Sequence, residues 1–216
     1  MKPWQDTSNR IEALIRRAIE AGWDLKKLRK ELIKVIGKIA NETNLLNEIF
    51  SADSEIKLYK GNVTIRGLYR KDKSLQTMYA EGNFDRFYAK QKQGINNDIV
   101  KVVKDYFRNK DSKYTESKCI ENVKAVMTKY RNSAQTIVNT ANANMSRMIN
   151  FNMAVEDGVK YFKYSGPPAE REFCRMMLDR VLSISEIKAL KNDFGGSAWY
   201  SCGGWNCRHR WDAYIE

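Results

Sequence analysis

Apolar residues recur every three or four positions over residues 8–50, which is the spacing of one face of an α-helix. The stripe is interrupted near Gly22, and Asp24 directly after the break is a suitable N-cap. The pattern therefore predicts two amphipathic helices separated near residue 22. The stripe consists of Ile11, Leu14, Ile15, Ala18, Ile19, Leu25, Leu28, Leu32, Val35, Ile36 and Ile39, with a further apolar turn at Leu45, Leu46, Ile49 and Phe50.

The pattern changes to alternation of apolar and polar residues over 55–70. Lys60-Gly61-Asn62 stands between two short alternating runs, so a small hairpin with its turn at these residues is expected. Helical spacing returns from Phe84 to Phe107. This stretch is also the best candidate for a basic helical face that contacts a partner or DNA, because it carries Lys101, Lys104, Arg108 and Lys110.

Residues 115–156 have the clearest helical pattern in the chain. Between Ser133 and Val155 the only charged residue is Arg147, and alanine, asparagine and methionine fill most other positions. A helix so poor in charge is seldom surrounded by water. We expect it to be covered, either by the rest of its own domain or by a neighbouring subunit.

Shorter elements are expected after Gly158, which is a suitable C-terminal cap for this helix. The pattern predicts a strand over 159–164, a helix over 169–180 that contains Cys174, and a short helix through Leu190 capped by Ser183 or Ser185. The fold class is therefore mainly α with a small α+β C-terminal module. We expect a basic helical region over 1–114 and a second region over 115–216, made of the long helix 115–156 and the module 157–216.

The net charge of +12 favours an acidic partner such as nucleic acid, although a basic excess can also serve solubility alone. Residues 1–114 carry 24 basic and 15 acidic groups, whereas residues 115–216 carry 14 and 11. The excess thus lies mainly outside the C-terminal module. No apolar run has the roughly 20 residues of a membrane helix, and no secretory signal is seen, so synthesis in the cytoplasm with reduced thiols is expected.

Three cysteines and the single histidine stand in the C-terminal region with the spacing Cys174-x27-Cys202-x4-Cys207-x-His209. Three thiols and one imidazole are sufficient for a closed tetrahedral zinc site. The spacing lacks the Cys-x2-Cys pairs of common zinc modules. Buried structural thiols and a disulfide, either Cys202–Cys207 or one of these with Cys174, are the alternatives.

An enzymatic role for this cluster is not favoured, since no third residue is evident to orient His209 as the base of a cysteine nucleophile. The sequence also has no phosphate-binding loop and no nucleotide fingerprint. We expect a protein without catalytic or cofactor-binding residues, apart from a metal at Cys174, Cys202, Cys207 and His209.

Three segments between Ala134 and Trp211 resemble a known family. They are the helix end Ala154-Val155-Glu156-Asp157-Gly158, the stretch Tyr164-Ser165-Gly166-Pro167-Pro168 that leads to Glu170-Arg171-Glu172-Phe173-Cys174, and the ending Cys202-Gly203-Gly204-Trp205-Asn206-Cys207-Arg208-His209-Arg210-Trp211. The ending is close to a Gly-Gly-x-x-Cys-Arg-His-x-Trp motif. In these segments the chain resembles the phage head-morphogenesis family, the minor head proteins similar to the F protein of phage Mu.

This resemblance implies a structural protein of the virion head, present in several copies and acting at the portal vertex or in the head interior. Its partners would be the portal or other head proteins, and packaged DNA. Arg171, Arg208 and Arg210 are then the expected partner contacts in the C-terminal module. The competing expectations are a nucleic-acid-binding protein with a zinc-stabilised module, and a cysteine-dependent hydrolase or toxin.

Overall fold

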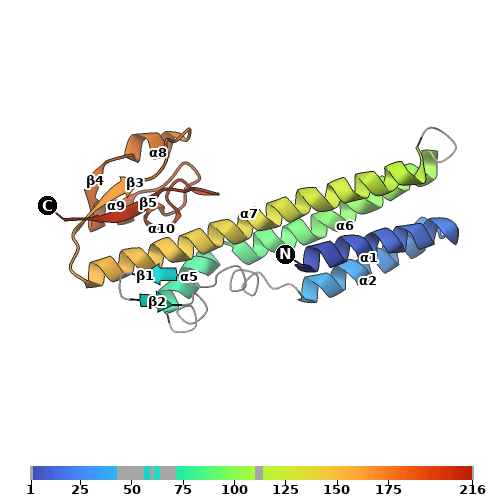
Figure 1. Cartoon of the computed structure of the whole chain (residues 1–216), viewed down its shortest axis with the longest axis horizontal. Coiled ribbons are helices and arrows are strands. Elements are labelled where there is room, and N and C mark those ends of the chain that lie inside the picture. The colour runs from blue at the N-terminus through green and yellow to red at the C-terminus, as the bar shows by residue number, and fades with distance from the viewer. Residues whose placement is uncertain (1, 43–55, 59–60, 64–71, 110–113, 216) are drawn as a thin grey trace. The chain divides into compact units, whose positions relative to one another are not determined.

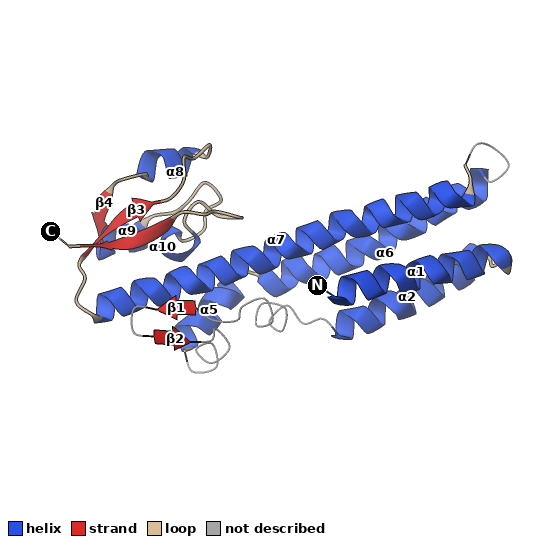
Figure 2. Cartoon of the chain, viewed as in Figure 1, coloured by secondary structure: helices blue, strands red, loops and turns tan. Residues whose placement is uncertain are grey.

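The computed structural model is predominantly helical, with a small three-stranded antiparallel sheet near the C-terminus, which confirms the predicted fold class (Figures 1 and 2). It describes residues 2–42, 56–58, 61–63, 72–109 and 114–215. No helix among these residues has both the length and the apolar character required to cross a membrane.

The contacts within the chain define two compact units, one of residues 1–48 and 85–135 and the other of residues 49–84 and 136–216. This division differs from the predicted one between residues 114 and 115. The long helix α7, Glu116–Glu156, belongs to both units, because its first half packs on the N-terminal helices and its second half on the C-terminal module.

The first unit is built from α1 (Lys2–Glu20), α2 (Leu25–Glu42), most of α6 (Phe84–Asn109) and the first half of α7. The predicted break between the first two helices is confirmed: Gly22 has a φ of +59°, and the Asp24 carboxylate accepts a hydrogen bond of 2.7 Å from the backbone N–H of Lys27. The predicted apolar turn at 45–50 lies outside the described residues.

Apolar side chains of all four helices form the core of the first unit, and polar contacts join the helices at its surface. Lys124 and Arg16 link α1 and α7 through ion pairs with Glu12 and Glu116. The buried apolar residues of this unit are Ile11, Leu14, Ile15, Ala18, Leu28, Leu32, Tyr88, Ile95, Ile99, Val103, Tyr106, Cys119, Ile120, Val123, Met127 and Ala134.

The predicted hairpin is present as β1 (Ile56–Leu58) and β2 (Gly61–Val63), which pair antiparallel. Gly61 and Asn62, expected in the turn, instead begin β2, because Gly61 pairs directly with Leu58. The following helix α5 (Lys73–Glu81) was not predicted. Asp72 caps it through a hydrogen bond from the backbone N–H of Ser74.

The charge-poor half of α7 is buried within its own chain, so the expectation of coverage by its own domain is confirmed for the apolar positions. Met145, Met148 and Phe151 are almost completely buried, and the Phe151 ring stacks on Phe162 of the sheet at 4.3 Å between centroids. Gly158, with a φ of +89°, ends the helix as predicted.

The C-terminal module contains a sheet in the order β4-β3-β5, formed by Val181–Ser183, Tyr161–Ser165 and Arg210–Tyr214. Of these strands only β3 was predicted, with a start at residue 159. The helix expected over 169–180 is shorter, since α8 spans Glu172–Met177 and Asp179 then adopts a φ of +63°. Helix α9 (Ile184–Ala189) is capped by Ser183, and α10 (Ala198–Ser201) was not predicted.

Candidate metal centre

Three of the predicted ligands meet in the interior of the C-terminal module. Cys174 lies in α8, Cys207 lies in the loop that follows α10, and His209 is the residue directly before β5. All three side chains are buried, and their sulfur and nitrogen atoms lie within 4.8 Å of one another. This convergence makes the three residues a candidate metal-binding cluster, which we call the Cys/His cluster.

Two distances in the Cys/His cluster can be compared with those around a tetrahedral metal ion, for which zinc gives the reference values. Zinc with Zn–S bonds of about 2.3 Å and Zn–N bonds of about 2.0 Å places two thiolates about 3.8 Å apart, and a thiolate and an imidazole nitrogen about 3.5 Å apart. The Sγ atoms of Cys174 and Cys207 are separated by 3.8 Å, and Cys207 Sγ lies 3.5 Å from His209 Nδ1. Two of the three donor separations therefore match those around a tetrahedral metal ion, and the thiol and imidazole donors are of types that metals bind.

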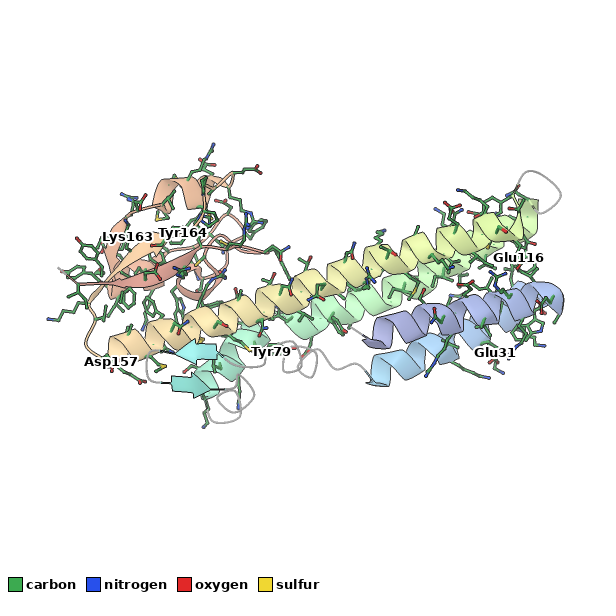
Figure 3. The ribbon with its side chains drawn as sticks, in the orientation of Figure 1. Glu31, Tyr79, Glu116, Asp157, Lys163 and Tyr164 are labelled. Carbon is green, nitrogen blue, oxygen red and sulfur yellow. The ribbon has the colours of Figure 1, made fainter. Side chains whose placement is uncertain are left out.

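Tyr164 supplies a further oxygen at the Cys/His cluster that the sequence analysis missed. Its hydroxyl lies 3.3 Å from Cys174 Sγ and 3.9 Å from Cys207 Sγ. The side chain projects from the central strand β3 (Figure 3) and is completely buried. In the sequence Tyr164 stands out only as part of the Tyr164-Ser165-Gly166-Pro167 segment. A tyrosine hydroxyl is not among the common metal ligands, which are thiolates, imidazoles and carboxylates.

Cys202, the fourth predicted ligand, is not one of the three converging donors. Its side chain is fully buried, but its backbone has a φ of +47° at the end of α10. All four cysteines of the chain are free thiols, so the structure contains none of the proposed disulfides. Cys119, the remaining cysteine, is buried in the other unit.

Two glycines allow the cluster to form. A Cβ atom added at Gly203 would lie 2.2 Å from Cys174 Sγ, and one added at Gly166 would lie 2.5 Å from His209 Cδ2. Both distances are shorter than any ordinary carbon contact. The Gly203 backbone N–H also donates a hydrogen bond of 3.2 Å to Cys207 Sγ, which would stabilise a thiolate.

Two arginines hold the loop that carries the cluster. Arg171 Nη1 donates to the Gly203 carbonyl at 3.0 Å. Arg147 of α7 donates to the Cys207 carbonyl and to Asn144 Oδ1. In the sequence Arg147 is the single charged residue between Ser133 and Val155. The structure explains its presence, because its guanidinium binds the loop that carries Cys207.

Burial shifts the protonation of Cys174 and His209 in the Cys/His cluster and of two groups beside it, Tyr164 and Cys202. It raises the pKa of the Cys174 thiol and of the Tyr164 hydroxyl, and it raises the pKa of Cys202 to about 12. Burial also lowers the pKa of His209, which favours the neutral imidazole that metals bind. The imidazole is held by parallel stacking on Tyr164, with 5.2 Å between ring centroids.

The residues predicted to contact a partner have different environments. Lys101, Lys104 and Arg108 are exposed on α6, three and four positions apart, and so share one face of the helix. Lys110 lies outside the described residues. In the C-terminal module Arg208 and Arg210 are exposed. Arg171 is partly buried, and its guanidinium donates a hydrogen bond to the Gly203 carbonyl of the loop.

In comparisons with known proteins, no protein-family model, no curated protein and no solved structure matches the chain.

Proposed function

We propose that this chain is a structural minor head protein of a tailed phage, with no catalytic activity. It would act in head assembly at the portal vertex or in the head interior, in several copies. The observation that supports the proposal is that Cys174 and the residues Gly203, Cys207, His209 and Trp211, from the two segments that resemble head-morphogenesis proteins, are buried together in one module. Such a motif serves to hold a module together.

The burial of the thiols supports a structural role over the hydrolase or toxin alternative. A nucleophilic cysteine must reach its substrate, and it needs a neighbouring base that is itself oriented. The candidate nucleophiles Cys202 and Cys207 are only 0% and 7% exposed. Their burial therefore suits a scaffold better than an active site.

We also propose that the Cys/His cluster binds zinc through Cys174, Cys207 and His209, with the Tyr164 hydroxyl or a water molecule as the fourth ligand. The separations of 3.8 Å and 3.5 Å between the donors support this ion. Bound zinc would cross-link α8, the loop that carries Cys207 and the start of β5 next to His209. Such a cross-link stabilises a module that is too small to have a large core of its own.

The proposal implies a portal protein encoded near this chain, and co-expression of the two tests the head-assembly role. The two proteins are expected to co-elute from a size-exclusion column at a fixed ratio that survives nuclease treatment and moderate salt. Separate elution, with DNA retained on this chain, would contradict the proposal and would favour the nucleic-acid-binding alternative.

A second candidate function is DNA binding through α6, favoured by the exposed face of Lys101, Lys104 and Arg108. Replacing all three by glutamine is expected to reduce the salt dependence of DNA binding, log Kobs against log [salt], by about 3 if each contacts a phosphate. Fluorescence anisotropy with a labelled duplex measures this slope. The same change at Lys26, Arg29 and Lys30 of α2 is the matched control, and equal slopes for the two variants would exclude α6 as the contact.

A further inference from the structure

A pocket of about 580 Å³ in the C-terminal half of the chain lies between α7 and β5. Its helical wall runs along one face of α7 from Ala143 through Asn150 to Asp157, the residue directly after the helix, which Figure 3 labels at that end. At a rise of 1.5 Å per residue this wall is about 21 Å long. We call this feature the α7–β5 groove.

The opposite wall of the groove is the open edge of β5. Four consecutive residues, Arg210 to Ala213, line the groove. Successive side chains of a strand point to opposite faces of the sheet. All four residues can border one groove only if it follows the edge of the strand, and β5 is an edge strand in the order β4-β3-β5.

Hydrogen bonding in the sheet shows which backbone groups face the groove. Tyr164 donates to the Arg180 carbonyl and accepts from the Asp179 N–H, so its backbone faces β4. Because the direction alternates along a strand, the backbone groups of Lys163 and Ser165 face β5. Their partners across the ladder are Asp212 and Arg210.

It follows that Trp211 and Ala213 direct their backbone N–H and C=O groups away from β3, toward the groove. Within the described part of the chain these backbone groups have no hydrogen-bond partner. Unpaired groups of this kind at a sheet edge are a template for another strand.

The charges and the apolar surface of the groove indicate the composition of that strand. Phe162, Trp199 and Met153 provide apolar surface. Arg147, Arg208 and Arg210 outnumber the two lining aspartates, and Arg210 is already paired with Asp212 at 2.7 Å. Arg208 is exposed and makes no ion pair with any described residue.

We propose that the α7–β5 groove binds an extended segment of a partner protein, which adds as a fourth strand beside β5. At about 3.4 Å per residue, a segment of roughly six residues fills the groove. Apolar side chains of the segment alternate with polar ones, and an acidic side chain pairs with Arg208. The groove borders the Cys/His cluster at His209, but its proposed contacts are the edge of β5 and Arg208, and the proposal does not require the partner to be a head protein.

To test this, the whole 216-residue chain is incubated with a randomised library of linear octapeptides on beads, and the peptides that bind it are identified. Fluorescein-labelled copies of the selected peptides are then measured by anisotropy. We expect alternating apolar peptides with an acidic residue. Selection of no such pattern would overturn the proposal.

Ala213→Pro removes the N–H that faces the groove and leaves the β3–β5 ladder intact, since proline is tolerated at strand edges. Loss of the hydrogen bond and the clash of the ring are expected to weaken peptide binding by about tenfold or more. Ala213→Val, which keeps the N–H, is the matched control and should change affinity by less than about threefold. Equal affinity of both variants would refute strand addition.

Arg208→Gln tests the charge. The variant should lower the affinity for the acidic peptide by at least about fivefold. Its affinity for a peptide in which asparagine or glutamine replaces the acidic residue should be unchanged. Equal loss for both peptides would contradict the assigned pairing. If Ala213→Pro fails to fold, hydrogen exchange of the wild-type protein decides: the bound peptide must slow exchange at Trp211 and Ala213, and unchanged exchange there refutes the proposal.

Discussion

On the proposed zinc assignment, replacement of Cys207 by serine is expected to weaken zinc binding strongly and to destabilise the C-terminal module. Cys207 is central to the Cys/His cluster, because its sulfur contacts Cys174, His209 Nδ1 and the backbone N–H of Gly203. Loss of one thiolate ligand should weaken zinc binding by more than about 100-fold, and in small metal-binding modules the binding free energy is folding free energy.

Zinc content by mass spectrometry and the thermal unfolding of the protein with and without a chelator measure this effect. The chelator should lower the Tm of the wild-type transition that reports the module and should leave Cys207→Ser unchanged. Cys119→Ala is the matched control, since Cys119 is buried in the other unit and should retain full zinc content when replaced. Equal zinc content in Cys207→Ser and the wild type would contradict the metal assignment.

Gly203→Ala is expected to have the second largest effect. The added methyl group would lie 2.2 Å from Cys174 Sγ, so either the sulfur or the loop must move. Overpacking of this kind costs about 1–3 kcal/mol of unfolding free energy, and movement of the thiol should also weaken metal binding. Chemical denaturation and a zinc titration measure the two effects.

Gly196→Ala is the control for this prediction, because its Cβ atom would meet only side-chain atoms of Asn192 and Ser201 at 3.3 Å or more. It should cost less unfolding free energy and leave zinc affinity unchanged. If the two glycine variants behaved alike, the close packing of Cys174 on Gly203 would not govern the cluster.

The long helices were predictable because each carries a sustained apolar stripe. In α6, Ile95, Ile99 and Val103 all lie at the predicted spacing, and all are buried. The short strands were not predictable. β4 has three residues, Val181 to Ser183, without alternation. β5, Arg210 to Tyr214, alternates polar and apolar residues over only five positions directly after the Cys/His segment, which is too short a pattern to distinguish a strand from a loop.

The Cys/His cluster was predictable in composition but not in detail. Cys174, Cys207 and His209 were identified from residue type, since thiols and imidazoles are rare in this chain. The absence of Cys202 from the three converging donors and the role of Tyr164 both depend on how the sheet and the loop are packed, which places the Tyr164 hydroxyl near two sulfurs. Both are tertiary effects that no local pattern encodes.

The structural role in the head is the central claim, and quantitative mass spectrometry of heads tests it most directly. The chain is produced together with the genes that flank its own, and any assembled heads are separated from free protein by density-gradient sedimentation. We predict a constant number of copies per head that remains after nuclease treatment. Recovery of the chain only among unassembled proteins would contradict the proposed function.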